Sequence, residues 1–163
     1  MRAYVGVGSN LGDRWGHLEL AARELRAAPG VMLLRASLVH DTRALGPRQP
    51  RFLNAVLELE SELSATQLLV TLLGIEERAQ RTRDVRWGAR TLDLDLLLYG
   101  DEVVRTERLT LPHPGLLSRR FVLAPMAELC PERIVPGTGR SVAALLRAVP
   151  DYDMVRAGLY PGV

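Results

Sequence analysis

The sequence contains no lysine and a single cysteine, and both scarcities limit what the chain can be. Cys130 has no partner within the chain, so an intrachain disulfide framework and a cysteine metal site are excluded. We therefore expect a protein of a reducing compartment, the cytoplasm. All 21 basic residues are arginine, whose planar fork suits phosphate, although a GC-rich genome would produce the same bias.

Long apolar runs and a strong net charge are also absent. No stretch approaches 18 uninterrupted apolar residues, and residues 1–5 lead into a strand-like run without an apolar signal sequence, so we expect no membrane-spanning segment. The chain has 163 residues, 47% of them apolar, with 21 basic against 19 acidic residues. These values are typical of one globular domain.

The order of predicted elements is strand, helix, strand, strand, helix, strand. The strands are predicted at residues 3–7, 31–42, 53–60 and 92–99, and the helices at residues 18–28 and 65–80, the second capped by Ser64. A strand at residues 102–106 is expected to pair back onto 92–99, and helices are expected near 119–129 and 142–148. This order is typical of an α+β ferredoxin-like βαββαβ sandwich with an antiparallel sheet, an added hairpin strand and C-terminal helices.

Two loops of this fold have unusual compositions. Residues 6–13 are glycine-rich, which suits either a sharp strand-to-helix turn or phosphate binding. Residues 43–51 contain two prolines, one glycine and three arginines. A loop of this length in a compact domain often closes over a ligand.

The predicted strand at residues 92–99 carries two carboxylates among leucines. Residues two apart on a strand point to one face, so Asp93 and Asp95 project together, away from the leucines that alternate with them. A buried unpaired carboxylate normally becomes neutral or pairs with a cation, and two kinds of cation are possible here. Ion pairs with the arginines at positions 81, 83, 86 and 90 are one solution, and Mg²⁺, which prefers oxygen ligands, is the other. Two aspartates can hold two magnesium ions about 4 Å apart, a geometry that clamps a phosphoryl group.

A family signature lies at the same place. The run WGARTLDLDLL at residues 87–97 resembles that of the 6-hydroxymethyl-7,8-dihydropterin pyrophosphokinases of folate biosynthesis. The family most often has proline where Ala89 stands, and often at Arg43 as well. The run GSNLG at residues 8–12 also matches, and the resemblance covers nearly the entire chain. It implies a single pyrophosphokinase domain over residues 1–163 with the ferredoxin-like fold.

The resemblance implies transfer of pyrophosphate from ATP to the hydroxymethyl group of 6-hydroxymethyl-7,8-dihydropterin, leaving AMP. Two Mg²⁺ ions on Asp93 and Asp95 would bridge the ATP phosphates. No covalent enzyme intermediate is expected, and Asp95 is the nearest candidate to accept the hydroxyl proton. Arg81 and Arg90 resemble the family's arginines that assist the transferring phosphates.

The same matching implies a set of nucleotide-binding residues. Trp87 would help a loop seal over the substrates, with a position in the core as the alternative. His113 lies between two prolines, where a structural hydrogen bond is the alternative. The implied ATP-binding residues are Glu76, Arg83, Trp87, Leu96, Arg108, Thr110, His113 and Arg119.

A pterin is flat and rich in donors and acceptors, so it needs stacking faces and an amide edge. Phe52 and Phe121, the only phenylalanines, resemble the family's aromatic pair, although burial in the core is the ordinary alternative. Asn54 would read the ring edge, and Thr42 and Leu45 would contribute through the backbone. The implied partners are thus ATP and the pterin.

Other functions stay open because this fold has many. One alternative is another ATP-dependent phosphotransferase, which would release ADP, and a second is a non-catalytic ligand-binding domain. An RNA-recognition domain would carry stacking aromatics on its central strands, where this chain offers only Tyr4 and Phe52. We expect no nucleic-acid partner, no membrane partner and a monomer.

Overall fold

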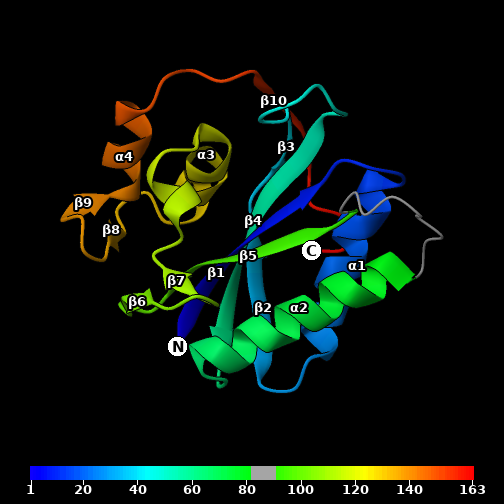
Figure 1. The fold of residues 1–163 in the computed structure, drawn as a ribbon, viewed down its shortest axis with the longest axis horizontal. Coiled ribbons are helices and arrows are strands. Elements are labelled where there is room, and N and C mark those ends of the chain that lie inside the picture. The colour runs from blue at the N-terminus through cyan, green and yellow to red at the C-terminus, as the bar shows by residue number, and fades with distance from the viewer. Residues whose placement is uncertain (82–90) are drawn as a thin grey trace.

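The computed structural model describes residues 1–81 and 91–163, in which an antiparallel sheet lies between two layers of helices (Figure 1). Within those ranges six strands form this sheet: β1 (Arg2–Ser9), β2 (Val31–Ala36), β3 (Val39–Thr42), β4 (Phe52–Ser61), β5 (Asp93–Tyr99) and β10 (Met154–Gly158). The strand order is β10-β3-β4-β1-β5, and β2 also pairs with β4. This is the predicted ferredoxin-like arrangement, extended at one edge by β10.

The two faces of the sheet are covered by different helices (Figure 1). One face carries α1 (Arg14–Ala27) and α2 (Ala65–Arg81), and the other carries the 3-10 turn η1 (Pro114–Leu117), α3 (Arg120–Leu129) and α4 (Val142–Ala148). Short hairpins pair β6 (Val104–Arg105) with β7 (Thr110–Leu111), and β8 (Ile134–Val135) with β9 (Arg140–Ser141). Throughout the described ranges, the helices lack the combination of length and hydropathy needed to span a bilayer.

Helix α2 begins where the sequence predicts. The Ser64 hydroxyl accepts a hydrogen bond from Gln67 N at 3.1 Å, and Gln67 Oε1 accepts one from Ser64 N at 2.9 Å. This reciprocal capping box satisfies two donors at the start of the helix. Leu68, Leu72 and Ile75 follow at helical spacing and are fully buried, so the apolar face of α2 is its sheet-facing side.

Alternation along the strands produces two apolar cores. Val5 and Leu57 pack with residues of α1 and α2, whereas their neighbours Tyr4 and Val56 pack with residues of α3 and α4. β5 carries one extra residue, because Tyr4 pairs with Leu98 while Val5 pairs with Leu96. This β-bulge turns two consecutive leucines of β5 toward the α3 side.

The predicted second strand at residues 31–42 is wrong, because the structure has two strands there. β2 and β3 pair with different parts of β4, on either side of Ser37 and Leu38. The Ser37 N–H donates to Val56 O, and the Ser37 hydroxyl accepts from Val56 N, both at 2.9 Å. The Ser37 side chain thus replaces one backbone hydrogen bond between neighbouring strands, and this interruption divides the predicted strand into two.

The predicted pairing of residues 102–106 with 92–99 is also wrong. β6 pairs with β7 in a separate two-stranded sheet. Thr106 closes this hairpin, since its N–H donates to Leu109 O at 2.9 Å and its hydroxyl accepts from Leu109 N at 3.1 Å. These local bonds satisfy backbone groups close to the turn, and the hairpin lies beside the sheet.

Strand β10 has no counterpart among the strands predicted from sequence. Its residues are partly or fully exposed, so the alternation of apolar and polar residues that marks a half-buried strand is missing. It pairs with β3, where Met154 lies opposite Thr42. This pairing brings the segment that precedes β10 next to the loop that follows β3.

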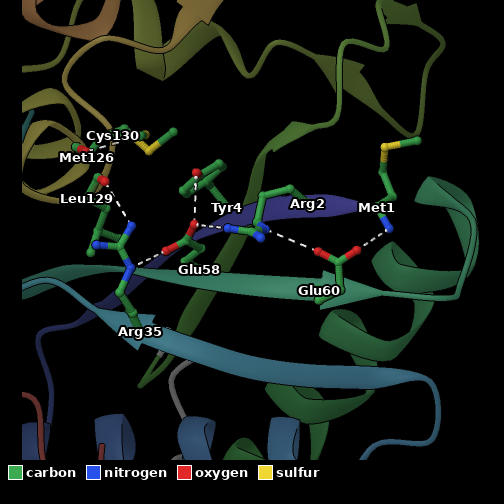
Figure 2. A network of polar contacts seen from close by, with 9 residues as sticks. All are labelled: Met1, Arg2, Tyr4, Arg35, Glu58, Glu60, Met126, Leu129 and Cys130. Atoms are coloured by element: carbon green, nitrogen blue, oxygen red, sulfur yellow. Dashed lines mark hydrogen bonds and ion pairs between the residues drawn. The ribbon is translucent and has the colours of Figure 1, made fainter.

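A buried carboxylate on β4 is held by an ion-pair network (Figure 2). Glu58 is only 1% exposed and accepts hydrogen bonds from Arg2 Nη1 at 2.6 Å, Arg35 Nε at 2.5 Å and the Tyr4 hydroxyl at 3.1 Å. Burial opposes ionisation, but the hydrogen bonds from Arg35 and then Arg2 outweigh it and keep the pKa of Glu58 below its ordinary value. Glu58 is therefore a carboxylate at neutral pH.

We expect Glu58→Gln to destabilise the fold at pH 7 by roughly 1–3 kcal/mol, through lost charge-assisted hydrogen bonds. A carboxyl with a lowered pKa stabilises the folded state above its unfolded pKa, and this contribution is lost as pH falls through the folded pKa. Between pH 7 and about pH 3, the variant should therefore lose less stability than the parent chain. Urea unfolding at both pH values measures this, with Glu62→Gln, at an exposed carboxylate nearby, as control. Equal losses in Glu58→Gln and the parent would contradict it.

Candidate active site

A cavity of about 260 Å³ lies at one end of the sheet, on the face covered by α3. β1 forms its floor, where Gly8 lies between Asn54 of β4 and Asp93 of β5. A Cβ atom at Gly8 would come within 3.0 Å of Asn54 Oδ1, so glycine permits this close approach. The predicted end of the first strand at residue 7 is too early, because β1 continues to Ser9 and includes two of the glycines assigned to a turn.

The residues predicted for the pterin all line this cavity: Thr42, Leu45, Phe52, Asn54 and Phe121. Asn54 Nδ2 donates to Thr42 Oγ1 at 2.7 Å, which fixes the amide at the cavity wall. Both phenylalanine side chains are half-buried and belong to neither apolar core of the described residues. The core alternative for the two rings is therefore not supported.

The carboxylates of β5 face the same cavity. Asp93 and Asp95 both line it, while Leu94 and Leu96 are buried on the α2 side, as strand alternation predicts. The Asp95 side chain is 52% exposed. Within residues 1–81 and 91–163 there is no cluster of three or more His, Cys, Asp or Glu side chains that could hold a metal. Two carboxylates on one face of a strand nevertheless suit Mg²⁺, which prefers oxygen ligands and keeps water and phosphate oxygens as its other ligands.

A second cavity, of about 240 Å³, adjoins the first. Glu76 of α2 lies in its wall, is 8% exposed and accepts a hydrogen bond from Leu94 N at 2.8 Å, which ties α2 to β5. Arg119, predicted with the nucleotide-binding residues, lines the first cavity instead. The other predicted ATP-binding residues that the structure describes line the second cavity together with Glu76: Leu96, Arg108, Thr110 and His113.

Asp95 and His113 line both cavities, so the two meet at this pair. His113 Nδ1 accepts a hydrogen bond from Gly115 N at 3.0 Å, which places the proton of the neutral ring on Nε2, 3.9 Å from Asp95 Oδ1. Burial lowers the pKa of His113, and although Asp95 opposes this, Arg119 adds to it. A neutral imidazole with an N–H donor therefore faces the junction. Its other nitrogen makes the structural bond that the sequence left as an alternative.

The remaining predicted residues lie at the end of α2 or in the segment that follows it. Arg83, Trp87 and Arg90 lie outside the described residues, and Arg81 ends α2. The ion-pair alternative for the β5 carboxylates involves these arginines and stays open. The described chain resumes at Thr91, whose carbonyl oxygen accepts a hydrogen bond from the Ser9 hydroxyl.

Known proteins are similar to this chain over most of its length. The model of the 7,8-dihydro-6-hydroxymethylpterin-pyrophosphokinase (HPPK) family matches residues 4–131. The chain belongs to this family. A 2-amino-4-hydroxy-6-hydroxymethyldihydropteridine pyrophosphokinase of Synechocystis sp. is 42% identical over 147 residues, covering 90% of this chain and 75% of that protein. One of Haemophilus influenzae is 37% identical and covers 94% of this chain and 96% of that protein.

Solved HPPK structures share the fold. Plasmodium falciparum HPPK-DHPS, solved as the wild type with pterin and p-hydroxybenzoate, matches with a TM-score of 0.70 at 12% identity. The match covers 90% of this chain and 42% of that one, so this chain spans less than half of the solved chain. At such low identity the match shows the HPPK fold alone.

Several residues that line the larger cavity of this HPPK chain were not assigned to it individually from sequence, although the two segments that contain them had been singled out. Gly6 and Gly8 face the cavity from β1, and Arg43 and Gln49 reach it from the loop between β3 and β4. The unusual composition of residues 43–51 was the available signal for the loop. The Arg43 N–H donates to Asp153 O at 2.9 Å, a bond that proline at this position could not make.

Proposed function

We propose that the two adjoining cavities carry out the reaction of the family, transfer of pyrophosphate from ATP to the hydroxymethyl group of 6-hydroxymethyl-7,8-dihydropterin, with AMP as the leaving group. The observation that carries this proposal is the junction, because Asp95 and His113 line both cavities. Two substrates held in separate sites that share one wall can react directly, without a covalent enzyme intermediate.

The larger cavity suits a flat heterocycle. Phe52 and Phe121 offer ring faces for stacking, and the amide of Asn54 offers a donor and an acceptor for the ring edge. The β5 carboxylates line the same cavity, so a pterin stacked here would direct its hydroxymethyl group toward Asp95. Asp95 is our candidate to accept the hydroxyl proton, because its side chain is half exposed at the junction.

The smaller cavity suits the nucleotide. Arg108 and Thr110 supply a guanidinium and a hydroxyl for polar groups of ATP, and Leu96 supplies apolar contact for adenine. Arg119 lines the larger cavity and affects the pKa of His113 at the junction, so it would neutralise charge on the transferring phosphates. The neutral His113 donates from Nε2 to a phosphate oxygen in this arrangement. We propose that Arg81, Arg83, Trp87 and Arg90 complete the site.

Asp93 and Asp95 are the proposed ligands of two Mg²⁺ ions, which would neutralise the ATP phosphates when bound.

We further propose that residues 1–163 act as one domain and as a monomer in the cytoplasm. The first point is supported by β5, which lines both proposed sites, and the last by the lone free Cys130. We propose no nucleic-acid or membrane partner.

Product analysis tests the proposal. The chain, incubated with ATP, Mg²⁺ and 6-hydroxymethyl-7,8-dihydropterin, should form AMP and the pterin diphosphate in equal amounts. Omission of the pterin should abolish AMP formation. ADP as the nucleotide product would indicate an ordinary kinase, and the absence of both products would indicate a binding domain.

A further inference from the structure

The start of the loop at residues 43–51 is held by two residues of the segment that precedes β10. The Arg43 N–H donates to Asp153 O at 2.9 Å, and the Tyr152 hydroxyl donates to Arg43 O at 2.7 Å. The Arg43 guanidinium also lies over the Tyr152 ring, 5.3 Å from its centroid, within the range of a cation–π contact. Both backbone polar groups and the side chain of Arg43 thus contact this dipeptide.

The end of the same loop is held by the same dipeptide. Arg51 donates to both carboxylate oxygens of Asp153, from Nη1 at 2.9 Å and from Nη2 at 3.0 Å, and its Nε donates to Asp41 at 2.6 Å. A bidentate pair fixes the orientation as well as the distance of its partners. The hydrogen bonds from Arg51 lower the pKa of Asp153, so the pair is ionised at neutral pH.

Tyr152 also contacts a second wall of the larger cavity. Its ring packs against Phe121, with centroids 5.3 Å apart and planes tilted by 47°. Phe121 lines the cavity from α3, while Leu45 lines it from the held loop. One dipeptide therefore contacts two walls of the cavity that belong to segments about 70 residues apart in sequence.

We propose that Tyr152 and Asp153 are positioning residues that set the spacing between Phe121 and the 43–51 loop, and thereby the affinity for the pterin. The identity of this ligand rests on the proposed function. The family match ends at residue 131, so both residues lie beyond it. Neither lines the cavity, and both act through residues that do.

The contacts are suited to positioning more than to global stability. The Arg51 and Asp153 side chains are 40% and 55% exposed, and exposed ion pairs contribute little to folding. The loop has another attachment, since Asn10 Nδ2 donates to Gln49 Oε1 at 3.0 Å and to Pro50 O at 3.3 Å. Loss of the dipeptide contacts should therefore leave a folded chain with a looser cavity.

The test compares the double variant Tyr152→Leu/Asp153→Ala with the parent chain. Calorimetry measures binding of 6-hydroxymethyl-7,8-dihydropterin in the presence of a non-hydrolysable ATP analogue, and binding of the analogue alone. We expect the Kd for the pterin to rise roughly tenfold, the KM for the pterin to rise with it, and kcat and the analogue Kd to change less than about twofold. Tyr152→Phe keeps the ring and loses only the hydroxyl bond, so it should show a smaller rise.

Asp151→Ala is the matched control, because this neighbouring side chain is fully exposed and should leave pterin binding unchanged. The positioning role would be overturned by a double variant that binds pterin like the parent, or by one whose pterin and analogue affinities fall together with its Tm. The parent chain reports separately on the proposed function. If the parent neither binds pterin nor forms AMP, the proposed function fails and the positioning role fails with it.

Discussion

Replacing Asp95 by asparagine is expected to reduce the rate of AMP formation roughly a thousandfold or more, with the fold intact. Asparagine keeps the shape of the side chain but removes the charge that a Mg²⁺ ligand and a proton acceptor both require. Because the Asp95 side chain is 52% exposed and lies at the junction of the two cavities, its loss should cost little stability. Asp93→Asn should also cause a large loss, through weaker metal binding alone.

Steady-state AMP formation at several Mg²⁺ concentrations separates these roles. High Mg²⁺ should restore part of the activity of Asp93→Asn and less of that of Asp95→Asn, which also lacks the proton acceptor. Asp101→Asn is the control, since Asp101 lies in the turn after β5, 87% exposed, and pairs with Arg133. Near-normal turnover in both β5 variants would defeat the two-metal assignment and favour the ion-pair alternative.

Phe121→Ala is expected to weaken pterin binding roughly 50-fold while leaving the affinity for an ATP analogue unchanged. The ring is half-buried, lines the larger cavity and belongs to neither core of the described residues, so its removal takes away a stacking face and little packing. Isothermal calorimetry with each ligand measures the selectivity. Leu117→Ala removes an exposed apolar side chain of η1 and should change neither affinity. Unchanged pterin affinity in Phe121→Ala would remove this ring from the proposed stacking pair.

The part of the fold that follows from local pattern was predictable from sequence. Helix α2 was predicted from its apolar residues, which recur every 3.6 positions, and from its Ser64 cap. The alternation in LDLDLLL predicted that both carboxylates lie on one face of β5. Both signals depend on neighbours within a few residues. The family signature at residues 87–97 added the reaction, which no local pattern contains.

The errors arise where one side chain or a distant segment decides the geometry. Ser37 divides a predicted strand through a bond to Val56, and Thr106 closes a hairpin that was expected to extend the main sheet. Strand β10 lacks an apolar stripe, so nothing local predicts it. Arg51 and Asp153 are 102 residues apart in the sequence. At this separation the spacing of residues along the chain does not predict which side chains meet.

The β-bulge in β5 has a consequence for how this chain can change in length. Opposite Tyr4 and Val5, β5 already carries an extra residue. One more residue inserted between Leu97 and the following turn can therefore enlarge the bulge without changing the pairing of β5 with β1 near the cavity. An insertion at Leu94 would instead rotate one carboxylate to the opposite face, because a shift of one residue reverses every side chain beyond it. Homologous chains should therefore vary in length on the turn side of the bulge and keep constant spacing on the aspartate side.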